Sequence, residues 1–146
     1  MPHLFDINCF LRLADKNSPQ RAIVLNAIRK LRANNEILYY TPQIPAEFWN
    51  VCTRPTSARG GFGLSFEQTE RKANILQKYF HLLPDNPATF YEWRKLVSDH
   101  KIVGLQVHDT KIVASMLTHK ILTLVTFNEK DFKRFAQITA VNPRNV

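Results

Sequence analysis

Short apolar runs alternate with longer stretches of mixed hydrophobic and polar positions along the chain. Each run is rich in aliphatic, β-branched or aromatic residues and is bounded by polar or turn-forming residues, a pattern that predicts a short buried strand. The runs occupy residues 4–5, 37–41, 82–83, 121–125 and 138–141. The pattern therefore predicts five strands, spread over the whole length of the sequence.

The stretches between these runs have apolar residues three or four positions apart, which is typical of a helix with one buried face. Two of the helix starts carry specific signals. Ser18 precedes Pro19, and Ser65 stands three residues before Gln68, as in a capping box. We expect helices at residues 9–13, 19–33, 45–51, 65–79, 87–98 and 106–119, and a shorter helix within residues 126–132.

Strands and helices alternate in this pattern from beginning to end. Such alternation favours an α/β fold in which helices cover a parallel sheet. No internal repeat, low-complexity segment or linker interrupts it. We therefore predict one domain over residues 1–146, a three-layer α/β/α sandwich with a central, largely parallel sheet.

Composition indicates the cellular compartment and makes a stabilising disulfide or structural zinc site unnecessary. A chain of 146 residues buries enough surface to fold without a disulfide or a structural zinc ion. Its two cysteines, Cys9 and Cys52, suit a reduced compartment, although a disulfide between them stays open. No basic region followed by an apolar run begins the sequence, and no apolar run is long enough to span a membrane. We expect a cytoplasmic protein that does not insert into membranes.

The charge balance points to a polyanionic partner. Twenty Lys and Arg residues against twelve Asp and Glu residues give a net charge of +8 and a pI near 9.8. A balance of this size is typical of proteins that bind nucleic acid. On charge alone, a basic protein without such a partner is equally compatible.

Four acidic residues stand where predicted elements meet. Asp6 and Asp131 follow predicted strands, and Glu47 and Asp109 lie near the starts of predicted helices. In open α/β sheets the carboxyl ends of the strands are where ligands bind. Asp6 alone also fits the role of a helix cap, and Glu47 alone fits a solvated helix start that the helix dipole favours.

Carboxylates that converge on one crevice repel one another, and a hard divalent cation relieves that repulsion. Mg²⁺ or Mn²⁺ binds carboxylate and water oxygens, and such a site activates water towards a phosphodiester. Without these four residues, eight acidic residues remain against twenty basic ones, a field that guides RNA or DNA to an acidic centre. The sequence therefore predicts a metal-dependent site for a nucleic-acid substrate.

Other site classes fit less well. Gly60, Gly61 and Gly63 lie in one loop, but neither a dinucleotide-binding nor a P-loop fingerprint surrounds them. A phosphatase of the haloacid-dehalogenase type also has an acidic residue after its first strand. It needs a second carboxylate two residues later, where this chain has Asn8.

Four short segments make a family resemblance specific. Residues 4–8 read Leu-Phe-Asp-Ile-Asn, and residues 45–51 read Pro-Ala-Glu-Phe-Trp-Asn-Val. Asp109 follows His108, and residues 126–132 read Thr-Phe-Asn-Glu-Lys-Asp-Phe. In this order and spacing they resemble the PIN domains of VapC-like toxin ribonucleases, over essentially the whole chain. The resemblance implies a metal-dependent endoribonuclease, the toxin of a toxin–antitoxin pair, with a central parallel sheet.

Carried over residue by residue, the resemblance implies that Asp6, Glu47 and Asp109 hold Mg²⁺ or Mn²⁺. Asn8 would support Asp6 or position water. Thr126, which directly follows the predicted strand at residues 121–125, would also support the site. The family also implies an RNA substrate, a homodimer and a small antitoxin protein as partner.

Two positions depart from the family pattern. Ile7 stands where the family usually has Thr or Ser, and its apolar side chain cannot hydrogen-bond the carboxylates. Asn128 stands where the family often has an acidic residue. We expect Asp131, one helical turn later, to supply the fourth carboxylate, ahead of Asn128 and of Glu129. The departures keep an alternative open, a PIN fold with impaired catalysis that binds RNA or a protein partner.

Overall fold

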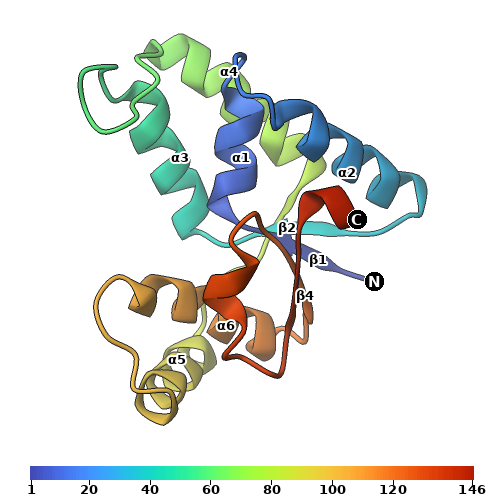
Figure 1. The fold of residues 1–146 in the computed structure, drawn as a ribbon, viewed down its shortest axis with the longest axis vertical. Helices are drawn as coiled ribbons and strands as arrows, with labels where there is room; N and C mark the ends of the chain where they lie inside the picture. The colour runs from blue at the N-terminus through green and yellow to red at the C-terminus, as the bar shows by residue number, and fades with distance from the viewer.

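The computed structural model describes residues 1–146, and its centre is a sheet of five parallel strands (Figure 1). Across the sheet the order is β3-β2-β1-β4-β5, and every pairing is parallel. The strands are β1 (His3–Phe5), β2 (Leu38–Tyr40), β3 (His81–Leu82), β4 (Thr123–Val125) and β5 (Thr139–Val141). Each overlaps the apolar run that predicts it.

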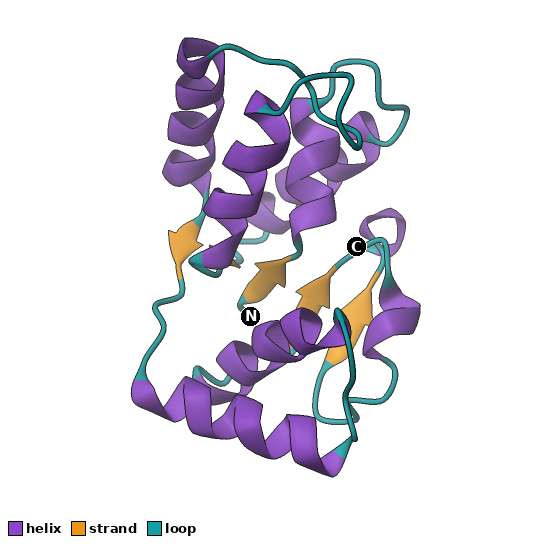
Figure 2. Cartoon of the chain, turned by 90° about the vertical axis from the view of Figure 1, so that its left-hand side faces the viewer, coloured by secondary structure: helices purple, strands orange, loops and turns teal.

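Helices lie on both sides of this sheet (Figures 1 and 2). On one side are α1 (Ile7–Ala14), α2 (Arg21–Ala33), α3 (Gln43–Thr53) and α4 (Phe66–Tyr79). On the other side are α5 (Pro87–Asp99), α6 (Gln106–Thr118) and the 3-10 helix η1 (Glu129–Phe132). A last 3-10 turn, η2 (Pro143–Asn145), follows β5 and packs against α2. The predicted three-layer α/β/α sandwich is confirmed, and its sheet is parallel throughout.

The central strands are buried on both faces. Successive residues of a strand point to opposite sides of the sheet. Leu4 of β1 and Leu124 of β4 join the apolar cluster that includes α5 and α6, whereas Phe5 and Val125 join the cluster that includes α1 and α3. All four side chains are inaccessible to solvent. This double burial is the reason why the strands are continuous apolar runs in the sequence.

Some helix boundaries differ from the sequence prediction. α1 spans Ile7–Ala14 rather than residues 9–13, because Asp6 caps the helix directly after β1. α3 begins at Gln43, so Pro45 lies within the first turn instead of opening the helix. Proline is tolerated there because the first N–H groups of a helix have no partner inside it. The capping box of Ser65 is confirmed at the start of α4.

Both cysteines are buried free thiols, and no disulfide joins them. Cys9 of α1 and Cys52 of α3 belong to the same apolar cluster, where they pack as small hydrophobic residues. No helix of the structure is long and apolar enough to cross a membrane.

The carboxyl ends of β1 and β4 bring distant parts of the sequence together. Phe5 pairs with Val125, so the next residues, Asp6 and Thr126, leave the sheet side by side. α1 starts from this edge, and so does the loop that leads to η1. In the view of Figure 2, α1 to α4 lie above the sheet and α5 and α6 below it.

Candidate metal centre

Asp6 is the only buried acidic residue of the chain, with 3% of its surface exposed. Its Oδ1 accepts a hydrogen bond from the Ile7 N–H at 2.8 Å, which caps α1. Its Oδ2 accepts hydrogen bonds from the Thr126 hydroxyl at 2.8 Å and from the Asn8 amide at 3.2 Å. Three donors therefore fix the orientation of this carboxylate.

Asn8 and Thr126 form a polar network around Asp6. Asn8 Nδ2 also donates to Thr126 Oγ1 at 3.1 Å, and Asn8 Oδ1 accepts from the Phe127 N–H at 3.2 Å. The network joins the start of α1 to the loop after β4. Ile7 contributes only its backbone N–H, since its side chain packs against the apolar cluster beside α1.

Burial raises the pKa of Asp6 above its usual value, because a charge is costly away from water. The hydrogen bonds from Thr126, Ile7 and Asn8 act in the opposite direction, and the negative charge of Asp131 raises the pKa further. The pKa is raised in spite of three donors. The protein itself therefore stabilises the charged form of this carboxylate incompletely.

Glu47 of α3 and Asp109 of α6 approach Asp6 from opposite sides of the sheet. Partial burial, and then the charge of Asp6, raise the pKa of Glu47. Burial, followed by the charges of the other three carboxylates, raises the pKa of Asp109 to about 6. Since each carboxylate acts on others, the four residues named from the sequence share one electrostatic site.

The segment after β4 contributes Asp131 to this site, because its charge acts on two of the other carboxylates. Glu129 is engaged elsewhere, since its Oε1 accepts a hydrogen bond from Asn142 Nδ2 at 2.9 Å. Asn128 is exposed, and its backbone N–H donates to the hydroxyl of Thr126 at 3.0 Å. Among the three polar residues of this segment, Asp131 is the one whose charge reaches the group.

No lysine or arginine forms an ion pair with any of the four carboxylates. The residue whose positive charge lowers the pKa of Glu47 and of Asp109 is His108. His108 is exposed at the start of α6. In the sequence, only its position directly before Asp109 points to this residue.

The donor set fits a hard divalent cation. All four side chains offer carboxylate oxygens, the ligands that Mg²⁺ and Mn²⁺ favour, and the protein supplies little positive charge of its own. No group of three or more Asp, Glu, His or Cys side chains is already arranged to hold an ion. The carboxylates share an electrostatic field but do not form a ready-made chelate.

Replacing Thr126 with Val should destabilise the protein by about 1–2 kcal/mol at pH 7.5, because a hydrogen bond to a buried charged group is lost. Urea unfolding of both proteins measures this difference. Thr118→Val is the matched control, since the Thr118 hydroxyl bonds a carbonyl of its own helix at 2.8 Å. Equal losses in the two variants would contradict a special role for the bond to Asp6.

Solved structures of toxin–antitoxin proteins share this fold. One is VapBC2 from Rickettsia felis, bound to a DNA fragment from its promoter. Its TM-score is 0.75 at 19% identity, and the match covers 97% of this chain and 98% of that chain. VapBC-1 from nontypeable Haemophilus influenzae has a TM-score of 0.69 and 22% identity and covers 98% of both chains. VapC20 from Mycobacterium tuberculosis, a sarcin–ricin loop cleaving toxin, has a TM-score of 0.65 and 12% identity and covers 91% of this chain and 95% of that chain. At these identities the likeness shows the fold alone.

The family itself is shown by the sequence. The family model of the PIN domain matches residues 4–138, which include all four carboxylates and the network around Asp6. No curated protein matches the chain in sequence. The match over nearly the whole length confirms the resemblance of the four motifs: the chain belongs to the PIN domain family.

Proposed function

We propose that this protein is a metal-dependent endoribonuclease of the VapC-like toxin type, with residues 1–146 acting as one PIN domain. One observation carries the proposal. Four carboxylates from the end of β1, α3, α6 and η1 act on one another, and no lysine or arginine pairs with them. An acidic site without a lysine or arginine partner is suited to a metal centre that cleaves phosphodiesters.

In this proposal Asp6, Glu47 and Asp109 hold Mg²⁺ or Mn²⁺, and Asp131 is the fourth carboxylate. A bound ion would offset the charge of the carboxylates, activate a water and stabilise the charge that develops on the phosphodiester. Asn8 and Thr126 keep the carboxylate of Asp6 in one orientation. Glu47 and Asp109 are more accessible to solvent than Asp6, so the site opens towards the side where α3 and α6 begin.

The charge of the whole protein supports a polyanionic substrate. A net charge of +8 attracts RNA from solution, whereas the acidic centre alone would repel it. VapC20, which shares the fold, is a toxin that cleaves the sarcin–ricin loop. A structure from Klebsiella pneumoniae, which also shares the fold, is a toxin–antitoxin complex. We extend these features to this chain as proposals: an RNA substrate, an antitoxin partner and, from the family, a homodimer.

A second candidate function is binding without cleavage. It is favoured by two residues: Ile7, whose side chain gives the site no hydrogen bond, and Asn128, which offers no carboxylate. In that case the same fold would bind RNA or a protein partner.

Cleavage of a structured RNA by the purified protein separates the two candidates. We expect cuts in the presence of Mg²⁺ or Mn²⁺ and none with a chelator. Absence of cuts with either ion, from protein that is folded and free of any inhibitor, would contradict the nuclease. Divalent-ion binding measured by calorimetry on the same sample would then show whether the carboxylates bind metal at all.

A further inference from the structure

Arg144 contacts Phe127, whose backbone bonds the polar network around Asp6, and Arg144 has no acidic partner. It belongs to η2, which directly follows β5. Its guanidinium stands over the ring of Phe127, with 5.8 Å between the central carbon and the ring centroid. Its side chain is exposed, and no ion pair of the structure includes it. The charge of Arg144 is therefore available to a ligand.

Several contacts hold the turn that carries Arg144. β5 ends at the same edge as β4, where the Thr126 N–H donates to the Val141 carbonyl at 3.0 Å. The side chain of Asn142 accepts a hydrogen bond from the Arg144 N–H at 3.0 Å and donates to Glu129 at 2.9 Å. η2 also packs against α2. The turn that carries Arg144 is thus attached to the strand edge and to η1.

Phe127 connects Arg144 to the carboxylates. The backbone N–H of Phe127 donates to Asn8 Oδ1, and Asn8 in turn donates to Asp6. Phe127 is also the residue directly after Thr126, whose hydroxyl bonds the same carboxylate. Phe127 is therefore the one residue that links the guanidinium to the polar network around Asp6.

We propose that Arg144 binds a backbone phosphate of the RNA substrate next to the bond that is cleaved. Four carboxylates repel a phosphodiester, and a cation at their side offsets that repulsion for the neighbouring phosphate. A guanidinium suits this role because it binds phosphate through two parallel N–H groups. The contact with the ring of Phe127 restrains the guanidinium. Arg144 is then a substrate-binding residue, and this inference rests on the proposed nuclease function.

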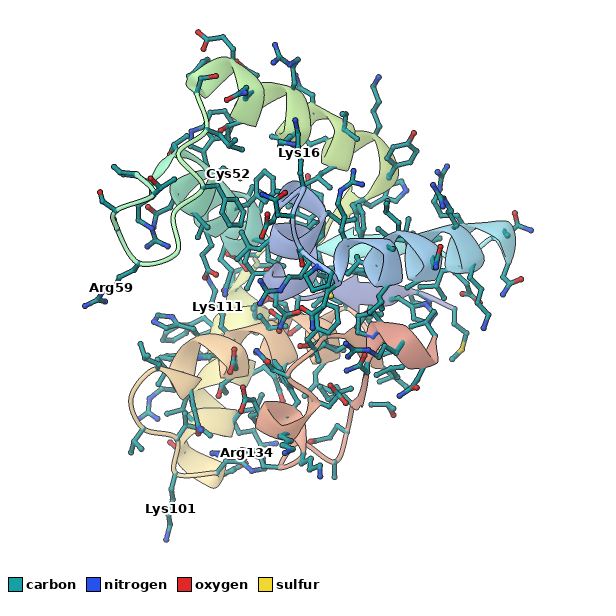
Figure 3. The ribbon with its side chains drawn as sticks, turned by 45° about the horizontal axis from the view of Figure 1, so that its top comes forward. Lys16, Cys52, Arg59, Lys101, Lys111 and Arg134 are labelled. Carbon is teal, nitrogen blue, oxygen red and sulfur yellow. The ribbon has the colours of Figure 1, made fainter.

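Four other cations, all labelled in Figure 3, differ from Arg144 in their position. In Figure 3, Arg134 and Lys101 extend from the end of the molecule formed by α5, α6 and the segment after η1. Arg59 extends outward from the loop between α3 and α4, and Lys16 from the turn after α1. None of these four contacts the network around Asp6. They add to the net charge and are suited to general attraction of a polyanion.

Binding of a labelled single-stranded RNA in the presence of chelator tests the proposal without requiring cleavage. Arg144→Gln should weaken binding about fivefold and reduce the slope of log K against log salt concentration by about 0.7, the value for one phosphate contact on a single strand. Arg144→Lys should restore part of the affinity and the whole slope, since it keeps the charge. Arg134→Gln is the matched control, because it removes one charge that lies far from the site. The affinity and the salt slope of this variant should stay close to those of the wild type.

In the cleavage assay Arg144→Gln should raise KM for RNA and leave kcat nearly unchanged. Wild-type affinity and wild-type salt slope in Arg144→Gln would overturn the assignment of Arg144 while leaving the nuclease proposal intact. Absence of RNA binding by the wild-type protein would overturn both. A loss of affinity equal in the Arg144 and Arg134 variants would show general attraction instead of a contact at the site, and would also overturn the assignment.

Discussion

Replacing Asp109 with Asn should reduce metal-dependent RNA cleavage by at least about 100-fold and leave the fold intact. The amide has the shape of the carboxylate but not its charge, so it holds a divalent ion much less tightly. The fold should persist because only burial and neighbouring charges, and no hydrogen bond, act on this side chain. Initial cleavage rates at saturating Mn²⁺, with circular dichroism on the same samples, measure both effects.

Asp109 is the most informative of the four positions for this experiment. Asp6 caps α1 and is bonded to Thr126, so its replacement changes local structure as well as charge. Asp99→Asn is the matched control, because it removes one exposed negative charge at the end of α5. Cleavage at the wild-type rate by the Asp109 variant, in a preparation without activity in the presence of chelator, would refute the proposed site.

The order of elements could be predicted from the sequence because the signals are local. The double burial of β1 and β4 produces apolar runs, and Ser65 with Gln68 marks the start of α4 without reference to other parts of the chain. Boundaries depend on contacts that the local pattern does not contain. α2 begins at Arg21 and not at Pro19, since the Ser18 hydroxyl accepts from the Gln20 N–H before the helix starts.

The strands are shorter than the runs that predict them for a similar reason. Thr139 N–H donates to the Leu122 carbonyl at 2.8 Å, yet the β4 ladder begins only at Thr123. Ile121 is buried, but its N–H bonds the Met116 carbonyl and closes the turn after α6. Hydrophobicity therefore predicts burial at Ile121 correctly and cannot tell a strand from a buried turn.

The types of residue in the site could be predicted, but their connections could not. The acidic residues follow from the rule that ligands bind at the carboxyl ends of parallel strands. The bonds of Asp6 and Asn8 to Thr126 join positions 120 and 118 residues apart in sequence. Arg144 gives no signal in the sequence, because only the pairing of β4 with β5 brings it beside Phe127.

The metal-free protein should become more stable as the pH falls from 7.5 to about 5, by roughly 1–2 kcal/mol. Folding raises the pKa of Asp109 from its usual 3.8 to about 6, and it raises the pKa values of Asp6 and Glu47 as well. The folded state therefore binds protons more readily than the unfolded chain, and the free energy of unfolding increases as the pH drops through the folded-state pKa. The gain ends below about pH 4, where the unfolded chain is protonated too. Glu47 and Asp109 are partly exposed, so solvent screens their charges. The gain in the free energy of unfolding is therefore smaller than the pKa differences alone would give.

Comparison with Asp109→Asn isolates this effect from other titrations, such as those of the five histidines. At pH 7.5 the variant should be more stable than the wild type by about 1 kcal/mol, and the difference should disappear towards pH 4 because the wild-type carboxyl is then neutral. Addition of Mn²⁺ at pH 7.5 should stabilise the wild type more than the variant, since the ion offsets the same repulsion. Urea unfolding series over this pH range, with chelator and with Mn²⁺, measure the three quantities. Parallel pH curves for the two proteins would contradict the coupling of Asp109 to the other carboxylates. The expected result, a variant that is inactive but more stable, would show that the negative charge needed for metal binding destabilises the metal-free fold.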